Sequence, residues 1–140
     1  MSTIMPMRFG TTLLALFLVV GLVFIVQEVM LKYSLDLTCP WCFAPLHFLS
    51  GFALGGCAAW GYFRFETFFG KFPYFFQIVL AVLITGIGWE IFEYATGMFA
   101  GQKNIVADTV VDLAMDMTGA WCAAYLMRGI FTHRKTSPLV

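Results

Sequence analysis

Apolar residues run through the chain in four long stretches that are separated by short polar segments. A helix needs about 20 apolar residues to span a bilayer. The first stretch carries no small-residue cleavage site, so we expect a retained helix and not a signal peptide. We therefore expect residues 1–140 to form one integral-membrane domain, an all-α four-helix transmembrane bundle with spans at about 11–31, 43–63, 74–98 and 105–127.

The composition supports a membrane location. Hydrophobic residues make up 61% of the chain and charged residues 11%, and the mean hydropathy is +0.86. Soluble domains are nearer 45–50% apolar and about 25% charged. Eight basic residues balance eight acidic ones, which argues against a nucleic-acid-binding face.

Basic residues in the short connecting segments are distributed unevenly. Only Lys32 and Lys103 fall on one side of the predicted spans. Because basic loops stay in the cytoplasm, we expect a multi-pass protein of the inner membrane with both termini cytoplasmic. The basic residues that predict this orientation are Arg8, Arg64, Lys71, Arg128, Arg134 and Lys135.

Six carboxylates fall within the predicted spans, where an ionised carboxylate costs at least about 2.5–3.5 kcal/mol near the bilayer centre. No Lys or Arg lies deep in a span to offset them. Helical spacing places Asp108, Asp112 and Asp116 on one face, and Glu90 and Glu93 on a face with flanking glycines. Together with Glu28 and His47, these acids should gather in the half of the bundle that faces away from the cytoplasm.

Three explanations of this gathering stay open. The acids are protonated or hydrogen-bonded, they relay protons or ions, or they bind a divalent metal ion such as Mg, Mn, Ca or Zn. The proton path lacks matching acids in the other half of the spans. Expected hydrogen-bond partners are Thr85, Thr109, Thr118 and Tyr94. The predicted metal ligands are His47, Glu90, Glu93, Asp108, Asp112 and Asp116, with Glu28 as an outer partner.

A Cys-Pro-Trp-Cys motif at Cys39 and Cys42 lies in the first loop on the same side. It could be a structural disulfide, a thiol-redox pair, or with His47 a thiolate metal site. The arrangement resembles quinone-linked disulfide-generating proteins of the DsbB type, which are also four-helix bundles. The second loop on this side carries no cysteine, and no Arg closely follows Cys42, so the resemblance ends there.

Three further segments resemble small YjdF-type and VanZ-like membrane proteins over about residues 47–120. In those families an H-F-x-x-G helix start, a G-W-x-E-x-x-E-like helix and a D-x3-D-M-x2-G-A helix recur in this order. The matching segments begin at His47, Gly88 and Asp112. The resemblance implies a cell-envelope membrane protein with His47, Glu90, Glu93, Asp112 and Asp116 as its polar centre.

These observations favour a small polytopic protein whose carboxylate and histidine site binds a divalent cation in the outer leaflet. The cation would hold the phosphate headgroup of a membrane lipid or polyprenyl carrier. One alternative is a periplasm-facing thiol-redox protein that uses Cys39 and Cys42. Another is a non-catalytic accessory subunit that packs against a membrane-protein partner or a second copy. Whether the protein is an enzyme stays open.

Overall fold

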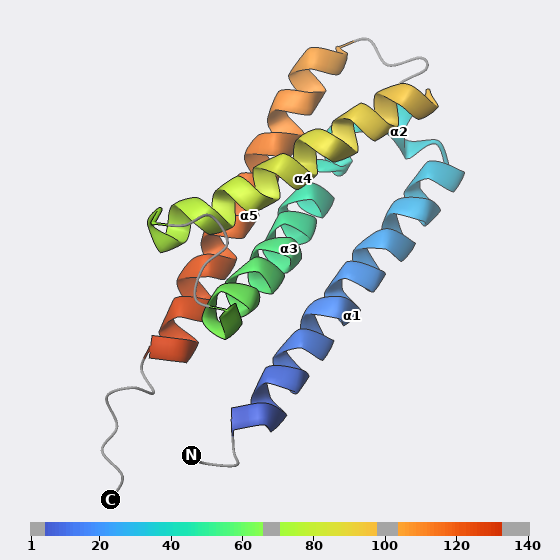
Figure 1. Cartoon of the computed structure of the whole chain (residues 1–140). Helices are drawn as coiled ribbons and strands as arrows, with labels where there is room; N and C mark the ends of the chain where they lie inside the picture. Colours follow the sequence, from blue (N-terminus) through green and yellow to red (C-terminus); the bar gives the residue numbers. More distant parts are fainter. Residues whose placement is uncertain (1–4, 66–70, 98–103, 133–140) are drawn as a thin grey trace, which may run out of the picture.

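The computed structural model describes residues 5–65, 71–97 and 104–132, and these ranges form an all-α bundle (Figure 1). Two short helices connect the first two long ones. This architecture confirms the predicted four-helix bundle. The long helices are α1 (Met5–Lys32), α3 (Ala44–Phe65), α4 (Tyr74–Thr96) and α5 (Ile105–Thr132), and the short ones are α2 (Leu35–Thr38) and the 3₁₀ helix η1 (Pro40–Cys42).

Helices α3 and α4 begin within one residue of their predicted starts, whereas α1 begins at Met5, before its predicted start at about residue 11. Helix α4 ends at Thr96 because Gly97 adopts a left-handed conformation, with φ of 76°, and its N–H bonds back to the carbonyls of Glu93 and Tyr94. Glycine adopts this conformation without strain. The predicted end of that span at Met98 lies outside the described residues. Helix α5 continues to Thr132, past its predicted end.

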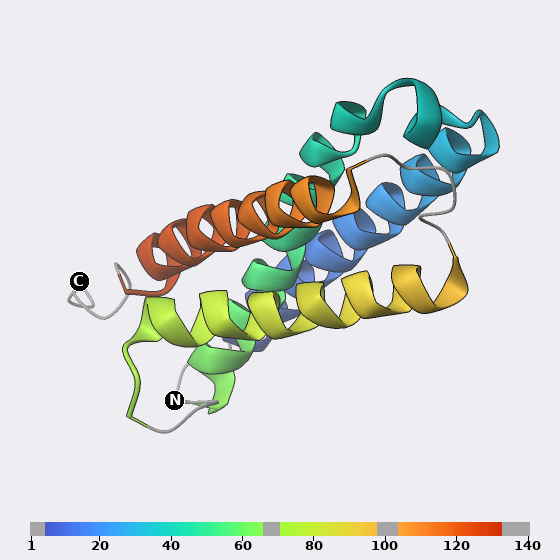
Figure 2. The same ribbon diagram turned by 90° about the horizontal axis from the view of Figure 1, so that it is seen from above.

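Helices α1 and α4 run in one direction through the bundle, and α3 and α5 run in the other (Figures 1 and 2). One end, which we call the disulfide end, carries the ends of α1 and α4 and the starts of α3 and α5. The opposite end, which we call the terminal end, carries the start of α1 and the end of α5. The predicted acids thus fall toward the disulfide end.

Helices α3 and α5 pack more closely than any other pair among the described residues. Small residues make this approach possible, because a Cβ added at Gly55 would lie 2.6 Å from the Cα of Ala120. A Cβ at Gly51 would overlap the backbone of Asp116, and one at Gly119 would overlap the backbone of Phe48 and Phe52. Close approach of small residues is typical of membrane helices, and here it fixes the register of α3 against α5.

Two helical segments, Gly10–Lys32 and Tyr74–Thr96, are long and apolar enough to cross a membrane. Helices α3 and α5 fall short of the same measure among the described residues because they carry glycines, one histidine and three aspartates. Several of these groups are buried where α3 and α5 meet, including Asp112, Asp116 and Gly119. The less apolar pair therefore forms the interior of the bundle, and the two more apolar helices flank it.

Candidate functional site

His47 lies in the first turn of α3 and sits between two carboxylates of α5. Its Nε2 lies 3.6 Å from Oδ2 of Asp112, and its Nδ1 lies 3.5 Å from Oδ2 of Asp116. Both distances exceed those of an ordinary N–H···O hydrogen bond, about 2.7–3.2 Å. The two aspartates are one turn apart on α5, so the imidazole faces a different carboxylate with each of its nitrogens.

Ser50 ties Asp116 to the first turns of α3. Its Oγ lies 2.8 Å from Oδ1 of Asp116 and 2.8 Å from the backbone carbonyl of His47, so the single hydroxyl proton can be donated to either oxygen. The sequence analysis missed Ser50. The available signal was its spacing of one turn from His47, which places both residues on the same face of the helix.

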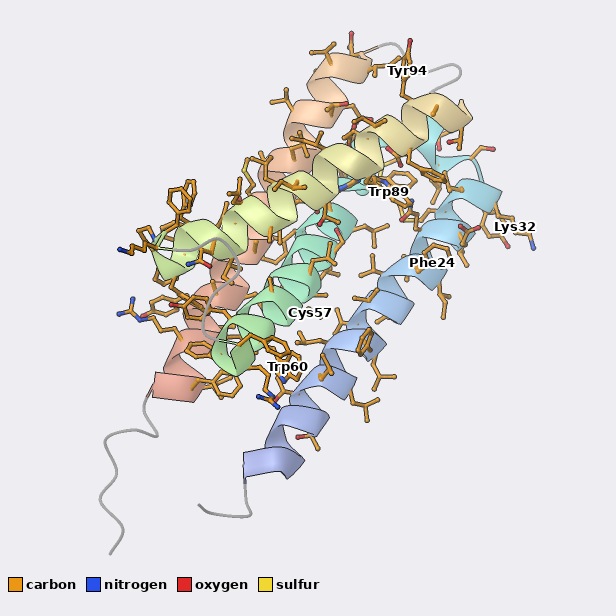
Figure 3. All side chains as sticks on the ribbon, viewed as in Figure 1. Phe24, Lys32, Cys57, Trp60, Trp89 and Tyr94 are labelled. Carbon is orange, nitrogen blue, oxygen red and sulfur yellow. A yellow bond between two sulfur atoms is a disulfide. The ribbon has the colours of Figure 1, made fainter. Side chains whose placement is uncertain are left out.

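Glu90 is buried between α4 and α5, where Thr109 donates a hydrogen bond of 2.6 Å from its Oγ1 to Oε2 of the carboxylate. Among the described residues, Thr109 is the only one of the four expected partners that hydrogen-bonds to a predicted site carboxylate. Thr85 and Thr118 donate instead to carbonyls one turn back in their own helices. Tyr94 is 74% exposed and points away from the bundle (Figure 3).

The remaining predicted site residues divide into two groups. Glu93 is half-buried and lies close enough to Glu90, His47 and Asp108 to interact with their charges. Asp108, also half-buried, interacts electrostatically with His47 and Asp112. Glu28 is exposed on α1. The structure thus brings together six of the seven predicted side chains and leaves Glu28 outside.

Among the described residues, no group of three His, Cys, Asp or Glu side chains is arranged as a ready metal site. The contacts that the structure provides are pairwise, from His47 to Asp112 and from His47 to Asp116. Lys32, the basic residue at the end of α1, points away from the bundle (Figure 3). A metal ion would therefore need a third ligand from water or from a side chain that moves.

Cys39 and Cys42 form a disulfide across η1, at the connection that leads into α3. The intervening Trp41 is 77% exposed. A disulfide has no thiolate to offer a metal ion, so in this oxidised state the two cysteines cannot join His47 as metal ligands. Cys57 and Cys122 are unpaired, half-buried thiols within α3 and α5.

A cavity of about 160 Å³ opens beside His47 and extends toward the middle of the bundle. Its walls come from α1, α3 and α4, and they are mostly apolar. Asp116, on α5, also lines it. Polar groups reach it from His47, Ser50 and Gln27. The cavity is therefore mostly apolar, and two titratable groups, His47 and Asp116, lie in its lining.

The sequence matches a known protein family. A model of a family described as predicted membrane proteins, DUF2238, matches residues 2–133. The chain belongs to the DUF2238 family. No curated protein and no solved structure matches the chain. In this DUF2238 protein the family match covers every described helix and every residue of the cluster, so the site lies within the part of the chain that defines the family.

Proposed function

We propose that this protein binds a divalent cation in the outer half of the inner membrane, between Nε2 of His47 and the carboxylate of Asp112. In this proposal all four long helices cross the membrane, both termini are cytoplasmic and the disulfide end faces the periplasm. The basic residues in the loops of the terminal end support that orientation. The bound cation holds the phosphate headgroup of a membrane lipid or polyprenyl carrier.

The observation that carries the proposal is that His47 lies between two carboxylates, of which Asp116 is held by a hydrogen bond from Ser50. A metal-binding histidine usually presents its second nitrogen to a carboxylate, which fixes the orientation of the ring. Asp116, anchored by Ser50, occupies that position beside Nδ1. Nε2 is then directed toward Asp112 at 3.6 Å. Two ligand atoms about 2.1 Å from a shared ion at a tetrahedral angle are about 3.4 Å apart, close to this separation.

Charge balance gives a second argument. Glu93 and Asp108 add negative charge next to His47 and Asp112, and no Lys or Arg among the described residues pairs with them. Buried carboxylates without a counter-charge are expensive. A divalent cation stabilises them, and Glu93 or Asp108 can supply its third ligand after a change of side-chain rotamer. An open coordination position would then bind a phosphate oxygen.

The test is a Mn²⁺ titration of the metal-free, detergent-purified protein, followed by electron paramagnetic resonance. We expect one tight Mn²⁺ site in the wild type and in Glu28→Gln, and at least about hundredfold weaker binding in Asp112→Asn, because loss of an outer partner alone costs about 10–100-fold. Glu28→Gln is the matched control, since it makes the same change at an exposed acid. Equal Mn²⁺ binding in all three proteins would overturn the proposal.

The disulfide supports a second candidate function, thiol-disulfide exchange with a periplasmic partner. A thiolate of the partner attacks one sulfur of the Cys39–Cys42 bond and the other cysteine leaves as a thiolate, so the partner is oxidised when its second thiol resolves the mixed disulfide. In a Cys42→Ser variant the Cys39 thiolate attacks the disulfide of the oxidised partner in the reverse step, one partner sulfur leaves as a thiolate, and the mixed disulfide at Cys39 should be trapped because Cys42 is absent to release it. Absence of any trapped species, with an unchanged phenotype for the double serine variant, would remove this candidate.

A further inference from the structure

The cavity beside His47 has an amphiphilic lining. Its walls are mostly apolar and come from three helices, and five polar side chains also line it: Gln27, His47, Ser50, Thr85 and Asp116. Ligand pockets commonly combine an apolar lining with a few polar groups that fix orientation. The apolar lining includes Val20, Val23, Phe24, Leu46, Leu54 and Trp89.

The cavity also has the dimensions of a hydrocarbon chain. An apolar cavity of about 150 Å³ accepts a benzene molecule, so the 160 Å³ available here accommodates the width of one chain. Along α3 the cavity extends from the level of His47 to that of Leu54, a rise of about 10 Å at about 1.5 Å per residue. Its polar end lies nearer the disulfide end, and its apolar end lies nearer the middle of the bundle.

Helices α1 and α4 both contribute side chains to the lining of the cavity. Helix α1 packs on α3 and contacts α2, and it makes no comparable packing with α4 among the described residues. Figure 1 shows α1 separated from α4 over most of its length, and in Figure 2 the start of α1 lies behind α4. Phe24 on α1 and Trp89 on α4 line the cavity from these two helices (Figure 3). Helices α1 and α4 contain the two segments that are apolar enough to cross a membrane, so we take lipid to reach the cavity between them.

From these observations we infer that the cavity binds one hydrocarbon chain of a phospholipid, which enters sideways between α1 and α4 and leaves its headgroup beside His47. A purely apolar ligand would leave the imidazole of His47 against hydrocarbon, although its contacts with the carboxylates of Asp112 and Asp116 are no shorter than 3.5 Å. A purely polar ligand would leave the walls at Val20 and Leu54 unfilled. A phospholipid matches both, because its ester and glycerol oxygens can meet Gln27 and Ser50 while its chain follows the apolar wall.

The position of the headgroup rests on the proposed function, since the phosphate is taken to bind the cation on His47. The position of the chain does not, because the apolar walls and the space between α1 and α4 exist without a cation. The two ideas can therefore fail separately.

The experiment uses phosphatidylglycerol with a diazirine in the middle of one acyl chain, mixed into vesicles that contain the purified full-length protein. After illumination, peptide mapping locates the crosslinks. In the wild type we expect labels around Val20, Val23 and Leu54, which line the cavity. Labels confined to the exposed side chains of α1, such as Leu18 and Leu22 at 66% and 60% exposure, would overturn the inference without any variant.

Two matched variants extend the test. Val20→Trp fills the cavity, whereas Leu22→Trp adds the same ring to the lipid-exposed face of the same helix. In Val20→Trp the new ring should displace about two methylene groups of the lipid chain, so cavity labelling should fall about tenfold. In Leu22→Trp cavity labelling should not change. Equal labelling of the two variants would overturn the inference. Val20→Ala, which cannot overfill the cavity, should retain labelling.

An EDTA arm separates this inference from the proposed function. Cavity labelling that persists in EDTA, in a protein that binds Mn²⁺ in the companion titration, supports the chain site as independent of the cation. Cavity labelling in a protein that never binds Mn²⁺ supports the chain site and overturns the cation site alone. Mn²⁺ binding without cavity labelling overturns the chain site alone.

Discussion

The two ends of the bundle handle buried polar groups in different ways. At the terminal end, Tyr74 donates its hydroxyl to the carbonyl of Ala124 at 3.0 Å, and the buried Gln77 donates its Nε2 to the carbonyl of Phe72 at 2.6 Å. These are neutral donors on backbone acceptors. At the disulfide end, His47 faces the carboxylates of Asp112 and Asp116 at distances longer than hydrogen bonds.

The packing around the polar groups also differs between the two ends. Around Tyr74, aromatic rings pack edge to face or tilted, including Tyr62 at 4.9 Å and Phe63 at 5.3 Å between ring centroids. Such packing adds about 0.5–1.5 kcal/mol per pair. The disulfide end has an apolar cavity next to its charged cluster instead. The hydrogen bonds and aromatic packing of the terminal end therefore stabilise the fold. The disulfide end instead contains buried charged groups and a cavity, and ligand binding would explain why both are present.

The largest effect is expected where the two ends are joined, at the close contact of α3 and α5. In Gly119→Leu the new side chain meets the backbone of α3, including the amide nitrogen of Phe52 at 2.6 Å. Backbone cannot move aside as a flexible side chain can, so we expect destabilisation of about 3 kcal/mol or more. Thermal unfolding in detergent measures this. Gly88→Ala is the control, because no atom lies within 4 Å of its new Cβ; similar melting of both variants would contradict the packing described.

The next effect concerns the orientation of His47. In Asp116→Asn the group beside Nδ1 loses its charge but keeps its shape, so the imidazole is held less firmly. We expect Mn²⁺ affinity to fall about 10–100-fold, with little change in the unfolding temperature. Isothermal titration calorimetry measures the affinity. An affinity equal to that of the wild type would show that Asp116 does not position the histidine.

Ser50→Ala should act in the same direction but less strongly. The variant removes the hydroxyl that lies 2.8 Å from Asp116 and leaves both charged partners of His47 in place. We expect about a tenfold loss of Mn²⁺ affinity, the lower end of the range for outer partners. Ser50→Thr, which retains the hydroxyl, should restore most of it. Identical affinities for the alanine and threonine variants would contradict a positioning role.

The smallest effect is expected at the terminal end. Tyr74→Phe removes the hydrogen bond to the carbonyl of Ala124 and leaves the aromatic packing intact. The free energy of unfolding should fall by about 1 kcal/mol, and Mn²⁺ affinity should not change. A change in Mn²⁺ affinity would erase the distinction drawn between the two ends.

Much of the fold could be predicted from the sequence, since four apolar stretches indicate four helices and their lengths follow from the stretches. The partners of His47 could not. They depend on the register of α3 against α5, which Gly51 and Gly119 set by backbone contact. The hydrophobic periodicity of one helix does not indicate which turn of the neighbouring helix each of its own turns contacts.

Glu28 shows a second limit. Depth along α1 placed it correctly near the disulfide end, but α1 is apolar on all sides, so its pattern does not indicate which face meets α3. The structure directs Val23 inward and leaves Glu28 exposed. By contrast, the helical spacing that places Asp112 and Asp116 on one face of α5 agrees with the structure, where both side chains are buried.

The most direct test of the central claim is elemental analysis of the purified protein in three forms: wild type, Asp112→Asn/Glu90→Gln and Cys39→Ser/Cys42→Ser. The cation proposal predicts a near-stoichiometric divalent metal in the wild type and in the cysteine variant, and its loss in the carboxylate variant. Absence of metal from all three, or loss only from the cysteine variant, would contradict it.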